Sequence, residues 1–360
     1  MDEISLLLAA IGAFVVTIGS IFALRPLALA IGLLDHPGGH KTHSGDIPII
    51  GGVGILLGTV FSLRANPQGF GPMSHYLFSA CLITITGMID DRFKLDHKIR
   101  LLVQFTALLP MFFAVHLQVT SFGDLLGFGP ILTNHWAILA TAIVVLGAIN
   151  AFNMLDGLDG LAASVSLSTL FLLLFSILQD NLPRHLTAAI LIAALIGSIA
   201  GFLVFNAPIK GNRAIRCFMG DAGSTLIGFT LVWLLVNLSQ GTHKVANPIT
   251  MVWLTSIPVT DLVWTVTRRL AKGQSPFHPD RSHLHHILLD SGLSVAGVVF
   301  TMASVGLLLG IVGLSLEFCH TSERTSLLLW MLTAAGIVIG FRSFARHRRA
   351  QPANADHTGH

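Results

Sequence analysis

The chain has 360 residues, of which 53% are hydrophobic and 11% are charged, and its mean hydropathy is +0.75. This composition lies far outside that of soluble globular proteins and makes the lipid bilayer the first hypothesis. The formal net charge of +3 indicates membrane orientation rather than a nucleic-acid-binding patch. We expect no cleavable signal peptide, because the first apolar run lacks a basic n-region and a small-residue cleavage site.

Apolar runs recur along the whole chain and predict an all-α polytopic integral membrane protein with about eleven transmembrane helices. We expect one membrane-embedded domain over residues 1–349, without repeats, and a polar, disordered tail over residues 350–360. The predicted spans, in chain order, are Ser5–Leu24, Ile47–Leu63, Tyr76–Ile89, Leu101–Val115, Trp136–Ile149, Leu161–Leu178, Leu186–Phe205, Ala222–Leu238, Ile249–Val266, Val295–Leu316 and Leu327–Phe341.

Basic residues set the predicted orientation, because cytoplasmic segments of membrane proteins are enriched in lysine and arginine. With a periplasmic N-terminus, every odd-numbered span exits into the cytoplasm, and the C-terminus is cytoplasmic. The cytoplasmic segments then hold 17 of the 21 lysines and arginines. The periplasmic segments hold only Arg64, Arg184, Lys244 and Arg324.

The polar motifs all fall on the cytoplasmic side of this predicted topology. They are "MIDDRFKLDHKIR" after the third span, "NAFNMLDGLDG" after the fifth, "FMGDAGS" before the eighth and "SPFHPDRSHLHH" after the ninth. The periplasmic segments are short and carry little that could do chemistry. We therefore predict an active face at the inner membrane surface.

Asp90 and Asp91 follow the third predicted span. A solvated helix end is the ordinary interpretation of such a pair. However, a negative charge at a helix C-terminus opposes the helix dipole, so a cation should offset it. That cation is either a divalent metal ion or one of the basic residues just downstream, which are Lys94, Lys98 and Arg100.

Asn150, Asn153, Asp156 and Asp159 recur every third residue and share one broad face while the chain stays helical. Asp159 is also placed to cap the following helix. A turn and a cap do not explain four oxygen-bearing side chains at membrane depth, which cost free energy unless they are paired, hydrated or bound to an ion. Hard oxygen ligands of this kind suit magnesium.

In "FMGDAGST", Gly220, Gly223 and Ser224 surround Asp221 where a helix is expected to begin. Small residues and free N–H groups at a helix N-terminus favour phosphate, and the aspartate is placed to hold a metal ion beside it. A plain N-cap is the alternative interpretation.

A loop rich in histidine follows the ninth span, with histidines at positions 278, 283, 285 and 286 beside Arg281. Zinc is possible on composition, but no cysteine accompanies the histidines and their spacing is not a standard ligand pattern. A basic loop that contacts phosphate fits better, and interfacial histidines without a role are the remaining alternative. Together, the motifs supply metal ligands and phosphate sites on one face, which is what phosphoryl transfer requires.

A cation transporter is the competing class, and a catalytically inert lipid-binding protein is a third. Transporters place ionisable groups and broken helices near the membrane midplane. Here the spans are almost free of charge, and Asp261 in the ninth span is the main exception. We expect a kink at Pro258 to turn Asp261 towards the cytoplasmic cleft.

The chain resembles the polyprenyl-phosphate N-acetylhexosamine-1-phosphate transferases and, within that family, the WecA type. The resemblance runs from about Asp35 to His286, and its motifs keep the family's order and its side of the membrane. These motifs are "KTHSGDIPIIGG", "DDRFKLDHKIR", "NAFNMLDGLDGLA", "FNAP" with "FMGDAGS", and "SPFHPDRSHLHH".

The resemblance implies an enzyme of the bacterial inner membrane with a cytoplasmic active site. It would transfer GlcNAc-1-phosphate from UDP-GlcNAc to undecaprenyl phosphate, release UMP and initiate a cell-envelope glycan such as lipopolysaccharide O-antigen. The cofactor would be Mg²⁺, with Mn²⁺ as a substitute, and no nucleic acid is implied. Relatives that use other UDP-N-acetylhexosamines have similar last loops, so the sugar stays open. A homo-oligomer is compatible with the sequence.

The resemblance also implies roles for individual residues. The metal ligands would be Asn153 and Asp221, assisted by Asp90 and Asp91. The catalytic set would be Asp90, Asp91, Asp156, Asp159 and Lys98. Substrate contacts would come from Lys41, His43, Asn150, Asn206, Gly223, Ser224, Arg281, His283, His285 and His286. This chain departs from the family at His40, where arginine is common. Direct attack of the lipid phosphate is the preferred interpretation, and a two-step route through an aspartyl-phosphate stays open.

Overall fold

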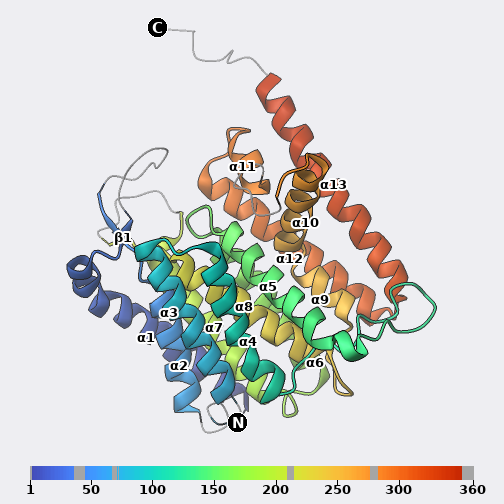
Figure 1. The fold of residues 1–360 in the computed structure, drawn as a ribbon, viewed down its shortest axis with the longest axis horizontal. Coiled ribbons are helices and arrows are strands. Elements are labelled where there is room, and N and C mark those ends of the chain that lie inside the picture. Colours follow the sequence, from blue (N-terminus) through green and yellow to red (C-terminus); the bar gives the residue numbers. More distant parts are fainter. Residues whose placement is uncertain are drawn as a thin grey trace.

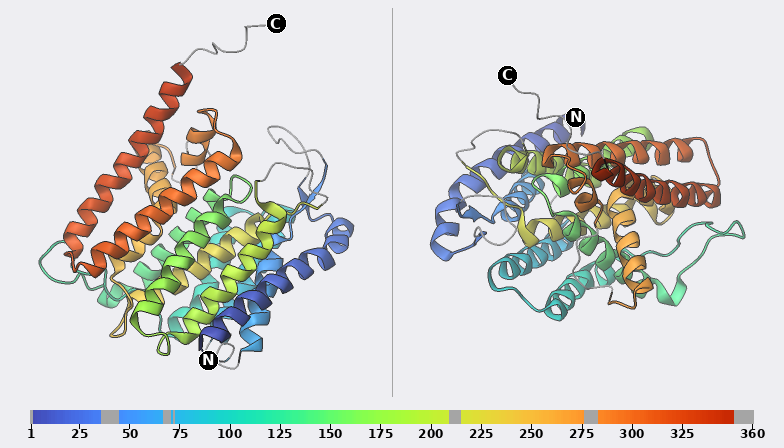
Figure 2. Two further views of the ribbon diagram at one scale, coloured as in Figure 1. Left: turned by 180° about the vertical axis from the view of Figure 1, so that it is seen from behind. Right: turned by 90° about the horizontal axis from the view of Figure 1, so that it is seen from above.

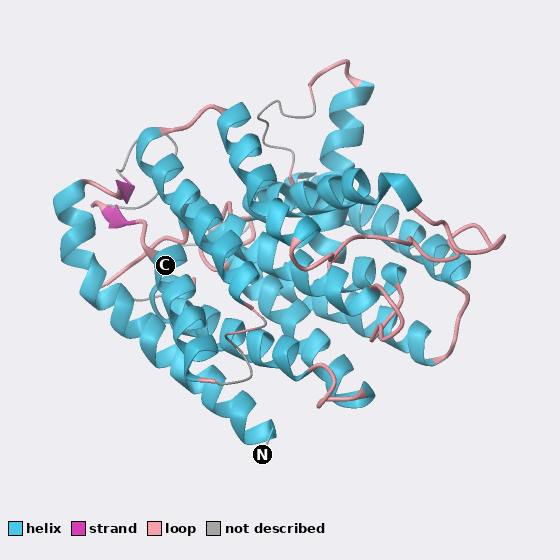
Figure 3. Ribbon diagram, turned by 60° about the horizontal axis from the view of Figure 1, so that its bottom comes forward, coloured by secondary structure: helices cyan, strands magenta, loops and turns pink. Residues whose placement is uncertain are grey.

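The computed structural model describes residues 2–35, 45–66, 71, 73–208, 215–275 and 283–350. Within these ranges the chain is helical, as predicted, apart from loops and two antiparallel two-residue strands, β1 (Leu34–Asp35) and β2 (Ile47–Pro48) (Figure 3). The α-helices are α1 (Asp2–Ile31), α2 (Gly51–Ala65), α3 (Ser74–Phe93), α4 (His97–Phe113), α5 (Ala137–Leu155), α6 (Leu161–Asp180), α7 (Leu186–Asn206), α8 (Gly220–Ser239), α9 (Pro248–Leu254), α10 (Ser256–Ala271), α11 (Leu284–Leu289), α12 (Val295–Phe318) and α13 (Glu323–Ala350).

Each predicted span falls on a helix, except that the second begins in β2 before it enters α2, and the ninth falls on the pair of α9 and α10. Seven helices in the described part of the chain are long and apolar enough to cross a membrane, and α9 with α10 would make an eighth. α2 is apolar but has only 15 residues, and α3 and α4 do not meet the same criterion. The protein is therefore a multi-pass α-helical membrane protein, and the count of eleven spans stays a prediction. Ala350 ends α13, and the rest of the predicted tail lies outside the described residues.

α8 forms the centre of the helical bundle (Figure 1). In its most apolar stretch 94% of the residues are buried, compared with 11% in α13. α2, α3 and α5 pack against α8, and α1 packs with α7 and α2. A helix that is apolar on every face belongs either in a protein core or in lipid. α8 takes the core position, whereas the exposed faces of α1 and α13 suit lipid.

The first turn of α1 and the last turns of α13 lie at opposite ends of the bundle (Figures 1 and 2). α13 projects beyond the other helices at the end where α10 and α11 lie. Such a placement is what an odd number of spans requires, because the two termini then lie on opposite sides of the membrane.

α9 and α10 meet at Thr255 with a bend of 89°. The expected kink at Pro258 is therefore wrong in position. Pro258 is the third residue of α10 and lies in its first turn. Backbone N–H groups in a first turn have no acceptor within the helix, so proline, which lacks this group, loses no helical hydrogen bond there. The bend, rather than a proline kink, gives α10 its direction.

α8 approaches α2 and α3 so closely that only glycine fits at two contacts. A Cβ atom at Gly52 would clash with the backbone of Gly223, and one at Gly87 would clash with the backbone of Ala222. Backbone atoms in packed helices cannot move aside as a flexible side chain can. These glycines therefore set the depth at which α8 lies in the bundle.

Gly52→Ala is expected to lower the free energy of unfolding by about 1–3 kcal/mol, because the added methyl group meets helix backbone. Gly19→Ala in α1 is the matched control, since a Cβ atom there meets open space. Alanine favours the helix over glycine by about 0.5–1 kcal/mol, so the control should be neutral or stabilising. Thermal unfolding in detergent measures both variants, and equal melting temperatures would contradict the close packing of α2 against α8.

Candidate active site

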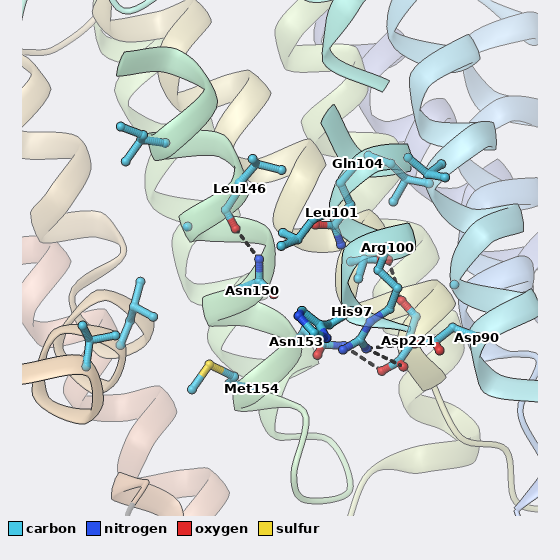
Figure 4. Close-up of a pocket in the computed structure, with 18 of the residues that line it drawn as sticks. Asp90, His97, Arg100, Leu101, Gln104, Leu146, Asn150, Asn153, Met154 and Asp221 are labelled. Carbon is cyan, nitrogen blue, oxygen red and sulfur yellow. Dashed lines mark hydrogen bonds and ion pairs between the residues drawn. The ribbon is translucent and has the colours of Figure 1, made fainter. Parts of the chain in front are cut away.

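A cavity of about 1270 Å³ lies between α3, α4, α5, α8 and α10 (Figure 4). Its polar lining residues include Asp90, His97, Arg100, Gln104, Asn150, Asn153, Asp221, Thr225, Arg269, Ser275 and His283. Its apolar lining residues include Ile83, Leu101, Val103, Ile143, Leu146, Leu262, Val263 and Val266. Because both kinds of surface line one space, the cavity suits a ligand with a charged head and an apolar body.

Arg100 is a cation at the polar end of the cavity. Its guanidinium group donates to Oδ2 of Asp90 at 2.9 Å and lies 3.7 Å from Oδ2 of Asp221 (Figure 4). Asp90 is 3% exposed, and its Oδ1 accepts the backbone N–H of Leu95 at 2.7 Å. Among the cations predicted to offset the charge of Asp90, Arg100 is therefore the one that pairs with it in the described structure. With both carboxylate oxygens engaged, Asp90 fixes the turn between α3 and α4 and holds Arg100 beside Asp221.

Asp91 caps the N-terminus of α8. Its Oδ1 accepts the N–H of Asp221 at 2.9 Å, and its Oδ2 accepts the N–H of Ala222 at 3.2 Å. A helix start leaves such N–H groups without helical partners, and the helix dipole favours a carboxylate there. Gly220 begins α8 with φ +69°, and a Cβ atom there would clash with this carboxylate. The N-cap interpretation of Asp221 is therefore wrong, since Asp91 supplies the cap.

Asn153 joins α5 to α8 at the same point. Its Nδ2 donates to Oδ1 of Asp221 at 2.7 Å and to Oγ of Ser224 at 3.0 Å. One turn earlier, Asn150 lines the cavity and donates to the carbonyl of Leu146 at 2.7 Å. The fold thus brings Asn153 together with Asp221, the two residues that the family resemblance implies as metal ligands.

The predicted helical stripe from Asn150 to Asp159 stops at the end of α5, where Asp156 is the C-cap residue. Asp159 lies in the following loop and accepts a hydrogen bond from Arg216. The expectation that Asp159 caps α6 is wrong, because this arginine binds its carboxylate and the N-cap residue is Gly160.

Asp156 lies among other carboxylates in the α5–α6 loop. Burial, together with the carboxylates of Asp221, Asp91 and Asp159, raises the pKa of Asp156 well above its usual range. The aspartates of three motifs therefore lie within electrostatic reach of one another. A cation in their midst would relieve this repulsion.

Nine of the predicted catalytic and substrate-binding residues in the described ranges do not lie among the cavity-lining residues, and Asn206, Gly223 and Lys98 are three of these nine. Asn206 is buried and braces the α5–α6 loop, since its Oδ1 accepts the N–H of Gly160 at 2.7 Å and its Nδ2 donates to the carbonyl of Cys217 at 2.9 Å. Gly223 packs against Gly52 of α2. Lys98 is exposed on the first turn of α4.

The described histidines of the last motif form a group of rings beside the cavity. The ring centroids of His283 and His285 lie 5.7 Å apart, and those of His285 and His286 lie 4.3 Å apart. His283 lines the cavity, whereas His285 is 1% exposed and packs against Gly157 of the α5–α6 loop. Burial and the neighbouring His286 lower the pKa of His285 to about 3, so its ring is neutral at pH 7.

Several predicted residues lie outside the described part of the chain: His40, Lys41, His43, His278 and Arg281. Conversely, His97, Gln104, Thr225 and Arg269 line the cavity although none of them is among the predicted site residues. Helical spacing could have found two of them, because Gln104 and Thr225 lie four residues after Arg100 and Asp221. His97 stands inside the quoted "DDRFKLDHKIR" motif.

The side chains around Asp221 suit a hard divalent cation. Carboxylate and amide oxygens are the ligands that Mg²⁺ prefers, and Asn153 turns its amide nitrogen to Asp221, which leaves its amide oxygen as a ligand. Among the described residues no three His, Cys, Asp or Glu side chains group as a complete metal site. Mg²⁺ commonly binds through one or two carboxylates together with substrate phosphates and water, so this sparse set fits it.

Asp156→Asn is expected to raise the melting temperature at pH 7 when divalent cations are removed by a chelator. The unfolded carboxyl group has a pKa of about 3.9, and the folded value lies above it, so ionisation costs stability as the pH rises through this interval. Below about pH 3 the group is protonated in both states, and the two proteins should melt alike. Thermal unfolding over a pH series measures this difference, and a variant that melts below the wild type at pH 7 would contradict it.

Comparison with known proteins supports the motif resemblance. Residues 73–239 match the model of glycosyl transferase family 4. The undecaprenyl-phosphate alpha-N-acetylglucosaminyl 1-phosphate transferase of Yersinia pestis is 36% identical over 85% of this chain and 83% of its own length. The proteins of the same name from Salmonella typhi and Pasteurella multocida are 37% and 33% identical, over 89% and 94% of this chain and 87% and 91% of their own lengths. The chain therefore belongs to glycosyl transferase family 4.

Proposed function

We propose that this protein transfers GlcNAc-1-phosphate from UDP-GlcNAc to undecaprenyl phosphate and releases UMP. Relatives at 33–37% identity over most of the chain are named for this transfer to undecaprenyl phosphate. The observation that carries the proposal is the meeting of Arg100, Asn153 and Asp221 in a cavity that also has an apolar wall. A lipid phosphate and a nucleotide sugar need both surfaces in one place.

The apolar wall supports a prenyl chain as the acceptor's body. Leu101 of α4, Ile143 and Leu146 of α5 and Val263 of α10 contribute to it. The acceptor phosphate would lie at the polar end near Arg100, whose side chain is 38% exposed and already balanced by Asp90. Arginine binds phosphate through a planar fork of N–H donors, so one side chain can hold and orient this group.

Asp221 and Asn153 would hold Mg²⁺, and Mn²⁺ would substitute for it. When bound, the ion would offset the charge of the two phosphate-bearing substrates and stabilise UMP as it leaves. The accumulation of carboxylates around Asp156 supports a cation at this point. Asp91 would contribute indirectly, because its cap fixes the first turn of α8 and with it Asp221.

The nucleophile would be an oxygen of the lipid phosphate, which attacks the phosphorus that bears the sugar and displaces UMP. A phosphate monoester has a second pKa of about 6, so it is mostly ionised near neutrality and a general base would add little. Asp90 fits a positioning role, since Arg100 and the N–H of Leu95 occupy its two oxygens. Approach of two anions is then the main barrier, and fixed cationic groups lower it.

The proposed enzyme lies in the bacterial inner membrane with eleven spans, a periplasmic N-terminus and its active site on the cytoplasmic side. The bias of lysine and arginine supports this orientation. The opposite positions of the first turn of α1 and the last turns of α13 are consistent with it (Figures 1 and 2). The lipid-linked product would initiate a cell-envelope glycan such as lipopolysaccharide O-antigen.

A cation transporter is not favoured. The carboxylates gather where α3 and α5 end and α8 begins, rather than in the middle of the spans. The relatives are named as transferases. Another UDP-N-acetylhexosamine in place of UDP-GlcNAc is the closer alternative.

The direct test measures UMP release and lipid-linked product with purified protein, undecaprenyl phosphate and labelled UDP-GlcNAc. Transfer should require Mg²⁺ and fall by more than about 100-fold in Asp221→Asn, because even outer-shell partners of a metal ion are typically worth 10- to 100-fold. Asp180→Asn is the matched control. It removes a carboxylate that pairs with His185 at the far end of α6 and should leave the rate unchanged.

Repeating the same assay with other UDP-N-acetylhexosamines tests the identity of the sugar separately from the class of reaction. Transfer from another UDP-N-acetylhexosamine, without transfer from UDP-GlcNAc, would keep the reaction class and replace the substrate. Absence of turnover with every such donor, in protein that melts cooperatively, would refute the proposed function. Full activity of Asp221→Asn would refute the role of this carboxylate.

The orientation is testable through Cys319, which is exposed in the connection between α12 and α13. The proposed topology makes this connection periplasmic, so a membrane-impermeant maleimide should label Cys319 in intact spheroplasts. Arg346→Cys, made in a Cys319→Ser background, places a thiol on the exposed surface of the last turns of α13. It should react only after the membrane is permeabilised, and the reverse pattern would invert the topology.

A further inference from the structure

A buried carboxylate on α10 has no part in the mechanism described so far. Asp261 is 2% exposed, and both of its oxygens reach the start of α11. Its Oδ2 lies 2.8 Å from Nδ1 of His283, and its Oδ1 accepts the backbone N–H of Leu284 at 2.7 Å. The sequence pattern had singled out Asp261 as the main charge within a span, and the structure gives it a specific partner.

The bend between α9 and α10 makes this contact possible. Because the chain turns by 89° at Thr255, α10 leaves the direction of α9 and lies beside the segment that precedes α11. Thr265, one turn beyond Asp261 and fully buried, has its hydroxyl 3.4 Å from the same ring nitrogen. A carboxylate buried this deeply is costly unless hydrogen bonds satisfy it, and Asp261 meets this condition only through His283 and Leu284 among the described contacts.

The hydrogen bond with Asp261 determines which ring nitrogen of His283 is available to a ligand in the cavity. A carboxylate oxygen accepts hydrogen bonds, and Oδ1 of Asp261 already accepts the N–H of Leu284, so we assign Nδ1 of His283 as the N–H donor to Oδ2. Nε2 is then the ring nitrogen that remains for a ligand. His283 lines the cavity that also contains Arg100 and Arg269, and these two arginines offer positive charge to a negatively charged ligand bound there. The diphosphate of a UDP-sugar is such a ligand.

We propose that Asp261 is a positioning residue for the donor: it fixes the ring of His283 and stabilises the positive charge that this ring carries when Nε2 also donates to a phosphate oxygen of the UDP-sugar. This inference rests on the proposed function. The chemistry is general, because a carboxylate on the far nitrogen of an imidazole fixes its tautomer and orientation in metal sites and in hydrolases alike. Asp261 itself touches no substrate in this arrangement.

The first test compares Asp261→Asn with Asp180→Asn. The amide oxygen of asparagine can still accept from Leu284, but its NH₂ group turns a donor towards Nδ1 and removes the negative charge. We expect kcat/KM for UDP-GlcNAc to fall by about 10- to 100-fold in Asp261→Asn, as for other outer-shell partners. The KM for undecaprenyl phosphate should stay unchanged. Asp180 also pairs with a histidine, at 3.1 Å, but at the far end of α6, so Asp180→Asn should behave as wild type.

A double-mutant cycle separates positioning from a structural role. His283→Asn retains an N–H donor near Asp261 but lacks Nε2. If Asp261 acts through His283, adding Asp261→Asn to His283→Asn should cause no further loss in kcat/KM for the donor. Independent, additive losses, or equal losses towards donor and acceptor, would show that Asp261 only anchors α11 and would overturn the proposal.

A measurement on the wild-type protein covers the case in which Asp261→Asn does not fold. The ¹⁵N spectrum of labelled histidine, assigned by the loss of one ring in His283→Asn, should show a hydrogen on Nδ1 of His283 and a second on Nε2 when UDP-GlcNAc binds. An unprotonated Nδ1 in the donor complex would overturn the proposal. A wild type that transfers no sugar phosphate from any UDP-N-acetylhexosamine would remove both the proposed function and this inference. An active wild type with a fully active Asp261→Asn variant would remove this inference alone.

Discussion

The capping of α8 by Asp91 is the interaction on which the arrangement of the site depends. α8 is the most buried helix of the bundle, and its N-terminus has backbone donors that need partners in an apolar environment. Asp91 supplies both of its oxygens to the N–H groups of Asp221 and Ala222. Consecutive helical residues point about 100° apart, so the neighbouring Asp90 faces a different direction and binds Arg100 instead. Two adjacent carboxylates thereby fix the helix that carries Asp221 and the cation that faces it.

The same region concentrates charge that works against folding. Asp156 lies near three other carboxylates, and glycines at positions 52, 87 and 220 let the helices come close enough to bring these groups together. Natural proteins tolerate such local conflicts where function requires them, and the stable core elsewhere compensates. Here the compensation comes from the apolar packing of α2, α3 and α5 around α8. A bound cation would neutralise part of this negative charge. The repulsion among the carboxylates would then favour binding of the cation together with two phosphate-bearing substrates.

The helices and the polar motifs were predictable because each is local in sequence. Each predicted apolar run coincides with a helix or a helix pair of the described chain, and the motif residues Asn153 and Asp221 do meet. The contacts that sequence reasoning missed join distant segments. Asp159 binds Arg216, 57 positions away, and Asp91 caps a helix that begins 129 positions later, at Gly220. Neither partner is visible from spacing along the chain.

Local geometry accounts for two further differences. The sequence motif favours Lys98 as a site residue and offers Arg100 only as an offsetting charge. In the structure, however, Asp96 caps α4, Lys98 lies exposed and Arg100 faces the cavity. The break at Thr255 gives no proline signal of its own, because Pro258 fits the first turn of the new helix. Sequence patterns therefore indicate that a helix is interrupted, but they locate the position of the interruption less accurately.

The measurement that tests the proposed chemistry most directly is the exchange of labelled UMP into UDP-GlcNAc. If the lipid phosphate attacks the sugar-bearing phosphorus directly, labelled UMP should enter UDP-GlcNAc only when undecaprenyl phosphate and Mg²⁺ are both present, because UMP can return only by reaction with the lipid-linked product. Exchange without the lipid would require a sugar phosphate held covalently by the enzyme and would contradict direct transfer. Absence of exchange with the lipid, Mg²⁺ and any UDP-N-acetylhexosamine would contradict the transferase account of the cavity.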